Sequence, residues 1–244
     1  MSIQKLKSII SESSNIVFFG GAGVSTESNI PDFRSETGIY NAKTKYGYPP
    51  EIMLSHSFFV KHTEEFYDFY KNQMIYKDAK PNQAHLALAK LEQMGKLKAV
   101  ITQNIDGLHQ LAGGKNVLEL HGSVYRNYCM KCKENYDLDY ILNSSEMVPK
   151  CSKCGGIVKP NVVLYEEALD SLVLEQSVSY IADADVLIVG GTSLAVYPAA
   201  GLIDYYKGNK LVLINKSKTA YDRKANLVIN DSIGKVLKEA VDEL

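Results

Sequence analysis

Four short apolar runs, each followed by glycine or a polar residue, constrain the fold of this chain more than any other feature. They are Ile16–Phe19, Ala99–Thr102, Asp185–Val189 and Lys210–Ile214. Runs of this length that stop at such residues are typical of buried parallel strands. Between two of them, the segment 82–94 has apolar residues at helical spacing, and Gly95 supplies a stop. Strands that alternate with helices predict an α/β fold with a doubly wound parallel sheet, whose ligand lies at the polar ends of the strands.

Two segments interrupt this alternation. The segment 33–81 is rich in Tyr and Phe, and its aromatic residues from Phe66 to Tyr70 fall on one side of an expected helix that Thr63 could cap. It is expected to be a helical insertion. The segment 125–158 holds all the cysteines and has little apolar periodicity, so it is not expected to bury a core of its own. The remaining ranges, 1–32, 82–124 and 159–244, are expected to form the sheet domain.

The charge balance argues against nucleic acid as a ligand. The chain has 244 residues, 27 basic against 28 acidic, with a net charge of −1, so it has no positive field that would gather phosphate backbones. With 45% hydrophobic residues it is expected to be globular rather than disordered. Neither a signal peptide nor an apolar stretch of about 18 residues is seen, which predicts a cytoplasmic protein without a membrane partner.

The cysteines form two pairs, Cys129-x2-Cys132 and Cys151-x2-Cys154. This spacing matches the two-knuckle zinc pattern, in which four thiolates meet around one ion. Two disulfides, or four unrelated core cysteines, are the alternatives, and a reducing cytosol argues against the disulfides. Four thiolates leave no open coordination position for water, so a structural Zn²⁺ is expected that holds a small lobe together.

Two glycine loops follow expected strands, at Gly21-Ala22-Gly23 and at Gly190-Gly191-Thr192-Ser193. The first resembles part of a dinucleotide fingerprint, but Thr26 replaces its third glycine and no acidic residue stands near position 41 to hold a ribose. Taken alone, such a loop fits a tight turn without a ligand equally well. A third strand ends in the polar Asn215, and together the three ends favour a nucleotide across the sheet while arguing against hydride transfer.

Polar residues also cluster after two apolar runs, in Thr102-Gln103-Asn104-Ile105-Asp106 and in Leu120-His121-Gly122. A single His or Asp taken alone is more commonly an exposed loop residue. His121 differs because it follows an apolar segment and precedes a glycine, which places an imidazole at the end of a strand. Such a position suits a general base. After the first glycine loop, Asp32-Phe33-Arg34 adds a charged pair around an aromatic face.

These motifs, in this order and over nearly the whole chain, resemble those of the sirtuins, a family of NAD-dependent protein-lysine deacylases. The segments that carry the resemblance are Gly21–Ser25, Ile30–Arg34, Thr102–Asp106, Leu120–Gly122, the two cysteine pairs, Lys159–Val163, Gly191–Ser193 and Asn215. The resemblance implies a Rossmann-type large domain, a small lobe made of the helical insertion and a zinc ribbon, and NAD bound between them together with an acyl-lysine peptide. Its products would be deacylated lysine, nicotinamide and acyl-ADP-ribose.

The resemblance also implies the residues that bind the cofactor. Asp106 and Ile105 would hold nicotinamide, and Phe33 would shield that pocket. The residues that would face the phosphates and ribose are Ala22, Thr26 and Arg34. The adenosine half would be bound by Thr192, Ser193, Asn215 and Ile233.

Catalysis and substrate binding follow from the same resemblance. Asn104 and Gln103 would position ribose hydroxyls and water, and His121 would deprotonate a ribose hydroxyl, a step typically worth about 10²–10⁴-fold. The acetyl-lysine peptide would contact Val162, Val163 and Tyr165. A mono-ADP-ribosyltransferase, or an NAD sensor without catalysis, is the alternative to a deacetylase.

The chain departs from the family pattern at the substrate loop, where Tyr165-Glu166-Glu167 replaces a Phe-Gly-Glu sequence. The added charge of Glu166 is expected to favour basic residues in the peptide. A second departure concerns the acyl group. Members that prefer succinyl-lysine carry a Tyr-x-x-Arg pair on the insertion, and the matching residues here are Tyr67 and Tyr70. Without the arginine, neutral acyl groups are expected to be preferred. The alternative is that Tyr67 and Tyr70 only pack the helix against the large domain, which predicts the same preference.

Overall fold

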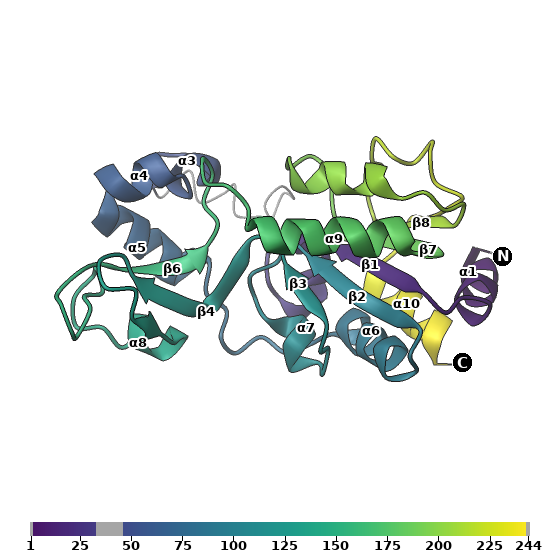
Figure 1. Ribbon diagram of the computed structural model, residues 1–244, viewed down its shortest axis with the longest axis horizontal. Helices are drawn as coiled ribbons and strands as arrows, with labels where there is room; N and C mark the ends of the chain where they lie inside the picture. The colour runs from purple at the N-terminus through teal and green to yellow at the C-terminus, as the bar shows by residue number, and fades with distance from the viewer. Residues whose placement is uncertain (1, 33–45, 243–244) are drawn as a thin grey trace.

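The computed structural model describes residues 2–32 and 46–242, which form a large and a small lobe (Figure 1). The large lobe contains a six-stranded parallel sheet in the order β3-β2-β1-β7-β8-β9. Its strands are β1 (Ile16–Gly20), β2 (Leu97–Thr102), β3 (Val117–Glu119), β7 (Val186–Gly190), β8 (Leu211–Ile214) and β9 (Leu227–Ile229). The order reverses between β1 and β7, as in a Rossmann sheet. The prediction of a doubly wound α/β fold is confirmed.

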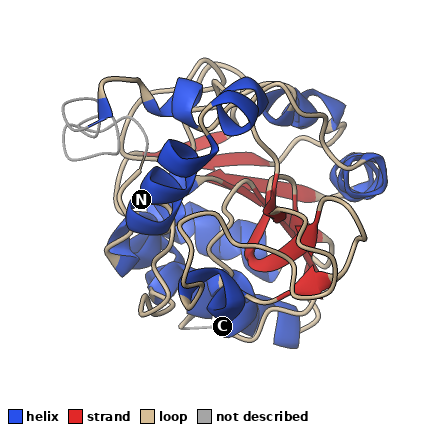
Figure 2. Cartoon of the chain, turned by 90° about the vertical axis from the view of Figure 1, so that its left-hand side faces the viewer, coloured by secondary structure: helices blue, strands red, loops and turns tan. Residues whose placement is uncertain are grey.

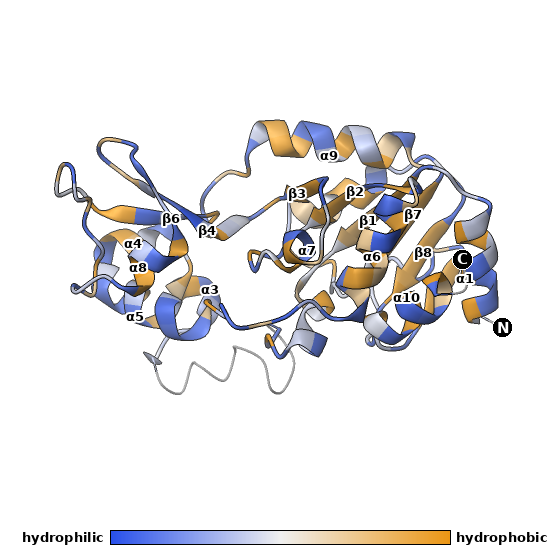
Figure 3. Ribbon diagram, turned by 90° about the horizontal axis from the view of Figure 1, so that it is seen from below, coloured by the Kyte–Doolittle hydropathy of each residue, from blue (hydrophilic) through white to orange (hydrophobic). Residues whose placement is uncertain are grey.

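Alternation along the strands creates two cores, one on each face of the sheet. In β1, Ile16 and Phe18 face one side while Val17 and Phe19 face the other, and all four are fully buried. The first face is covered by α1 (Ser2–Ser11), α6 (Gln83–Gln93) and α10 (Ile233–Val241), and the second by α9 (Ser171–Asp183) and the 3-10 helix η4 (Ala199–Tyr205). Strands of the sheet are accordingly hydrophobic along their length (Figure 3).

The helix α6 begins at a capping residue that the sequence analysis did not single out, and it ends at the predicted Gly95. The Asn82 side chain accepts a hydrogen bond from the amide of Ala84 at 2.9 Å, and the His85 ring accepts one from the amide of Asn82 at 3.2 Å. These bonds satisfy amides that the first helical turn leaves unpaired. At the other end, Gly95 has φ of +73°, a left-handed conformation that glycine adopts without strain.

The small lobe combines the helical insertion with the cysteine segment. The insertion contributes α3 (Pro50–Met53), α4 (His56–Lys61) and α5 (Thr63–Gln73). The cysteine segment contributes the antiparallel sheet β5-β4-β6, made of β4 (Gly122–Cys129), β5 (Asn135–Tyr136) and β6 (Val158–Val162), and the helix α8 (Leu138–Leu142). Viewed from this end of the molecule, helices surround the strands (Figure 2).

One hydrophobic core is shared by both parts of the small lobe. Phe58, Phe66 and Phe69 of the insertion pack in the same cluster as Val158 and Ile141 of the cysteine segment. The expectation that the cysteine segment lacks a core of its own agrees with this sharing. The division of the chain at residues 33, 82, 125 and 159 remains a proposal. The strand β4 crosses the boundary at 125, and β6 crosses the boundary at 159.

Thr63 does not cap α5, so this expectation was wrong. His62 occupies the N-cap position, and Thr63 is the first helical residue. Its hydroxyl instead donates a hydrogen bond back to the carbonyl of Phe59 in α4, at 2.8 Å. The helix α4 ends at Lys61, two residues before α5 begins, so a carbonyl of its last turn lies within reach of the Thr63 hydroxyl.

Among the described residues, no helix is both long and apolar enough to cross a membrane.

Candidate active site

A cavity of about 650 Å³ opens where the carboxyl ends of the large-lobe strands face the small lobe. This is the edge of a doubly wound sheet at which ligands bind. Every described residue that the sequence assigned to the cofactor, catalysis or substrate lines it: Ala22, Thr26, Gln103, Asn104, Ile105, Asp106, His121, Val162, Val163, Tyr165, Thr192, Ser193, Asn215 and Ile233. Phe33 and Arg34 lie outside the described residues.

The two glycine loops touch each other at the point where the strand order reverses. The amide of Gly23 donates to the carbonyl of Gly191 at 2.8 Å. A Cβ atom at Gly23 would lie 2.8 Å from the Cα of Gly191, and Gly191 has φ of +60°. Side chains are therefore excluded here, and backbone is exposed to the cavity. A backbone surface of this kind suits a pyrophosphate group, which approaches main-chain amides closely.

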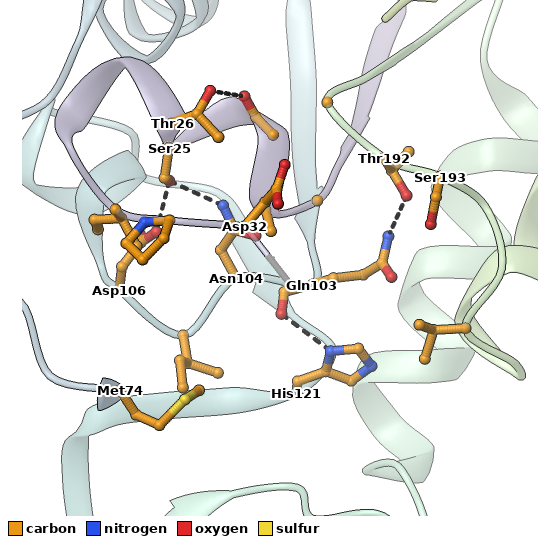
Figure 4. A pocket seen from close by; sticks show the side chains of 18 of the residues that line it. Ser25, Thr26, Asp32, Met74, Gln103, Asn104, Asp106, His121, Thr192 and Ser193 are labelled. Atoms are coloured by element: carbon orange, nitrogen blue, oxygen red, sulfur yellow. Dashed lines mark hydrogen bonds between the residues drawn. The ribbon is translucent and has the colours of Figure 1, made fainter. Parts of the chain in front are cut away.

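A cluster of three polar side chains lines the bottom of the cavity, and one of them was not assigned a role from the sequence. Ser25 donates a hydrogen bond to the Asp106 carboxylate at 2.6 Å and accepts one from the Asn104 amide at 3.0 Å (Figure 4). The amide of Leu108 donates to the other carboxylate oxygen at 2.9 Å. Ser25 was missed because its partners are about 80 residues away in the chain. Its position directly after a glycine loop was the only local signal.

The carboxyl group of Asp106 is held in a buried environment. Burial raises its pKa, while the hydrogen bonds from Ser25 and from the amide of Leu108 act in the opposite direction. These two hydrogen-bond donors suit an ionised carboxylate, which accepts hydrogen bonds and has none to donate. The arrangement presents a polar group of fixed orientation at the bottom of the cavity, where an uncharged amide of a ligand could be bound.

His121 lies just before β4, with its ring in the cavity. Its Nδ1 atom lies 3.0 Å from the carbonyl oxygen of Gln103. A carbonyl oxygen can only accept, so Nδ1 carries the proton and Nε2 is left as the basic atom. Burial lowers the pKa of the imidazole, and the bond to Gln103 acts in the opposite direction. The ring is therefore neutral near pH 7, as a general base requires.

The side chain of Gln103 points along the cavity towards the second glycine loop. Its amide donates to the hydroxyl of Thr192 at 3.2 Å, and this hydroxyl also accepts from the amide of Leu194 at 3.2 Å. At the far end, the side-chain amide of Asn215 donates to the carbonyl of Ser217 at 2.8 Å. The predicted residues that follow β2, β7 and β8 are thus brought to one surface, although they are far apart in the sequence.

The segment after β6 forms the opposite wall and connects the two lobes. The amide of Val163 donates to the carbonyl of His121 at 3.0 Å, and the amide of Tyr165 donates to the carbonyl of Leu54 at 2.9 Å. Glu166 has φ of +74°, a left-handed conformation that glycine adopts without strain and other residues adopt rarely. Its carboxylate accepts from the amide of Ser57 at 2.8 Å. The wall is thereby fastened to both His121 and the helical insertion.

Tyr67 and Tyr70 do not line the cavity, so the hypothesis that places them beside the acyl group is wrong. They pack, as the alternative expects, but in the core of the small lobe rather than against the large domain. Both are fully buried in the core of the small lobe, and the Tyr67 hydroxyl donates to the carbonyl of Val158. The rings of Phe66 and Tyr70 are stacked at 5.7 Å. Their apolar contacts within the lobe determine their orientation. The insertion instead presents Gln73 and Met74 to the cavity.

The four cysteine sulfurs converge in the small lobe. All lie within 4.8 Å of one another, and two pairs, Cys129 with Cys154 and Cys132 with Cys151, are 3.5 Å apart. Thiolates around one Zn²⁺ at about 2.3 Å stand about 3.8 Å from each other, so the sulfurs fit this ion. These separations are too long for disulfide bonds of about 2.05 Å. The residues fit a closed, structural zinc site.

Comparison with known proteins agrees with this geometry. The model of the Sir2 family matches residues 21–198. An NAD-dependent protein deacetylase of Clostridium tetani is 70% identical over 241 residues, covering 99% of this chain and 98% of the relative. The corresponding protein of Clostridium acetobutylicum is 68% identical over 239 residues, 98% of each chain.

Solved structures are similar over the whole chain. A Sir2 structure with a p53 peptide and NAD⁺ has a TM-score of 0.88 and 40% identity, and the match covers 100% of this chain and 98% of the other. A Sir2 variant with a deacetylated p53 peptide and 3'-O-acetyl ADP-ribose has a TM-score of 0.91 and 39% identity, with the same coverage.

Proposed function

Because this chain belongs to the Sir2 family, we propose that it is an NAD-dependent protein deacetylase, which removes acetyl groups from protein lysines and releases nicotinamide and O-acetyl-ADP-ribose. One observation carries the proposal. The neutral imidazole of His121 lies in the same cavity as the two glycine loops, whose exposed backbone suits phosphates. The segment after β6, which connects the two lobes, lines this cavity as well. A dinucleotide and a peptide can therefore both reach the same base.

The cavity residues fit NAD, whose glycosidic bond supplies a nicotinamide leaving group when the cofactor is bound. We assign the nicotinamide to Asp106 and Ile105, and Phe33 is proposed to shield it. Asp106 is held in place by Ser25. The residues proposed for the phosphates and ribose are Ala22, Thr26 and Arg34, and those proposed for the adenosine half are Thr192, Ser193, Asn215 and Ile233.

The proposed chemistry at His121 follows from its tautomer. Nε2 accepts a proton from a ribose hydroxyl, while the Nδ1–H bond to the Gln103 carbonyl holds the ring in place and stabilises the imidazolium that forms. Asn104 and Gln103 orient the ribose hydroxyls and water. Asn104 is itself oriented by its bond to Ser25 at 3.0 Å. The acetyl-lysine peptide is proposed to lie against Val162, Val163 and Tyr165.

The zinc site supports the shape of the cavity rather than the reaction. We propose that Cys129, Cys132, Cys151 and Cys154 hold one Zn²⁺ as thiolates. A full set of four sulfur ligands leaves no place for water on the ion. Metal-free thiols of this kind persist only in a reducing compartment until they bind zinc, which favours the cytoplasm.

The function is tested by incubating the purified protein with NAD and an acetyl-lysine peptide, followed by mass spectrometry. We expect deacetylated peptide, nicotinamide and O-acetyl-ADP-ribose in equal amounts. His121→Ala serves as the control, because it removes the base and leaves the two glycine loops intact. ADP-ribosylated protein without O-acetyl-ADP-ribose would instead indicate a mono-ADP-ribosyltransferase. NAD binding without any product would indicate a sensor.

A further inference from the structure

An amide in the first turn of α10 donates a hydrogen bond to a residue from the other end of the chain. Ser232 occupies the N-cap position, but its side chain makes no capping hydrogen bond. Instead, the amide of Gly234 donates to the Glu27 carboxylate at 2.9 Å, across 207 residues of sequence. A negative charge at this end of a helix is favourable, because the amides of the first turn have no partner within the helix.

Gly234 permits this contact because it lacks a side chain. A Cβ atom at Gly234 would lie 2.5 Å from Oε2 and 3.0 Å from Cδ of Glu27. The first distance is shorter than real Cβ contacts, so an alanine here would displace the carboxylate, which is the end of a flexible side chain. Glu27 and Gly234 are therefore a matched pair in which each residue depends on the identity of the other.

Both ends of this contact border the cavity assigned to the cofactor. Thr26, Glu27 and Ile233 all line it. Ile233 is only 4% exposed, and its side chain lies directly over Gly190 at the end of β7, where a Cβ would be 2.3 Å from the Ile233 Cδ1 atom. Glu27 lies two residues after Ser25, whose hydroxyl donates to the Asp106 carboxylate. The contact thus connects the wall next to the nicotinamide residues with the wall next to the adenosine residues.

We propose that Glu27 is a positioning residue for the cofactor, which fixes the separation between the loop of Thr26 and the start of α10. The inference rests on the proposed function. The hydrogen bond from the Gly234 amide to the Glu27 carboxylate holds Ile233 over the sheet. It also holds Thr26 against the first glycine loop, where the Thr26 hydroxyl donates to the carbonyl of Gly23 at 3.0 Å. Losing the bond widens the cavity on the cofactor side only.

The test compares Glu27→Ala with Glu27→Gln, whose side-chain oxygen still accepts from Gly234. Binding of ADP-ribose is measured by calorimetry, and kcat and both KM values by steady-state kinetics. Glu27→Ala is expected to weaken ADP-ribose binding and raise the KM for NAD by about three- to tenfold, the loss of one hydrogen bond. The kcat and the KM for peptide are expected to change by less than about twofold. Glu27→Gln is expected to restore most of the affinity.

Asp137→Ala is the matched control for a capping role alone. Asp137 accepts from the amide of Tyr140 at the start of α8, at 2.9 Å, and does not line the cavity. It is expected to lower the midpoint of thermal unfolding without a change in ADP-ribose affinity. If Glu27→Ala behaves in the same way, Glu27 only caps a helix and the proposal is overturned.

Gly234→Ala provides a second and independent variant. It is expected to weaken ADP-ribose binding in the native background and to add little in the Glu27→Ala background, because the bond is already absent there. Equal effects in both backgrounds would contradict the pairing. Calorimetry measures ADP-ribose binding without turnover, so it tests this inference independently of the proposed function. If the native protein binds ADP-ribose but forms no product, the deacetylase function is refuted, and the Glu27 and Gly234 variants still decide the pairing.

Discussion

Replacing Gly122 by alanine is expected to damage both the fold and the active site. Gly122 has φ of +74° and pairs with Val162 across β4 and β6. A Cβ atom there would lie 2.0 Å from the carbonyl oxygen of Asn161, a main-chain atom that cannot rotate away. The neighbouring residue is His121, whose carbonyl accepts from Val163 in the same pair of segments. The strands must separate to admit the methyl group.

The magnitude has two parts. The left-handed backbone costs alanine about 1–2 kcal/mol relative to glycine. Overpacking against a main-chain oxygen adds about 1–3 kcal/mol. Gly95→Ala separates the two, because Gly95 has nearly the same φ of +73° and nothing within 4 Å of the added Cβ. A loss of about 2–5 kcal/mol is therefore expected for Gly122→Ala, against about 1–2 kcal/mol for the control.

The assay is urea denaturation of both variants, with kcat measured on the folded proteins. At this chain length each 1 kcal/mol corresponds to a shift of about 2–4 °C in Tm, so the thermal midpoints give a second measure. Gly122→Ala should also lose turnover, since the ring of His121 moves relative to the Gln103 carbonyl, while Gly95→Ala keeps it. Equal losses of stability in the two variants would refute the steric argument.

Four further outcomes are expected. His121→Ala should bind NAD normally and lose about 10²–10⁴-fold in kcat; residual turnover above a tenth of the native rate would exclude a general-base role. The base must be neutral to act, and burial lowers the pKa of His121, so the acid limb of the kcat/KM profile should lie below about pH 6.5, the ordinary value for histidine. Metal analysis should find about one zinc per chain, and Cys129→Ala should lose both the metal and the fold of the small lobe. Full activity in a metal-free Cys129→Ala protein would contradict a structural zinc site. Deacetylation should exceed desuccinylation of one peptide by about tenfold or more in kcat/KM. No arginine is found among the described residues that line the cavity, so a succinyl carboxylate there would lack a bidentate partner. Equal rates would contradict this.

Features that depend on neighbours in the sequence were predictable. The four apolar runs became strands because their composition favours burial on both faces of a sheet. Gly95 ended α6 because only the local backbone angle matters there. The cysteine pairs met because two residues between cysteines place both sulfurs on one side of a turn. These signals, with the motif order, were enough to identify the family and the cavity-lining residues.

Features that depend on contacts between distant segments were decided only by the tertiary structure. Thr63 bonded backwards because α4 ends beside it, and Tyr67 and Tyr70 were drawn into a core that the zinc-binding segment completes. No local pattern indicates which face of α5 meets that segment. The bonds from Ser25 to Asp106, and from Gly234 to Glu27, join residues 81 and 207 positions apart. Such bonds form because parallel strands bring their carboxyl ends to one edge, where loops from the whole chain compete for the same partners.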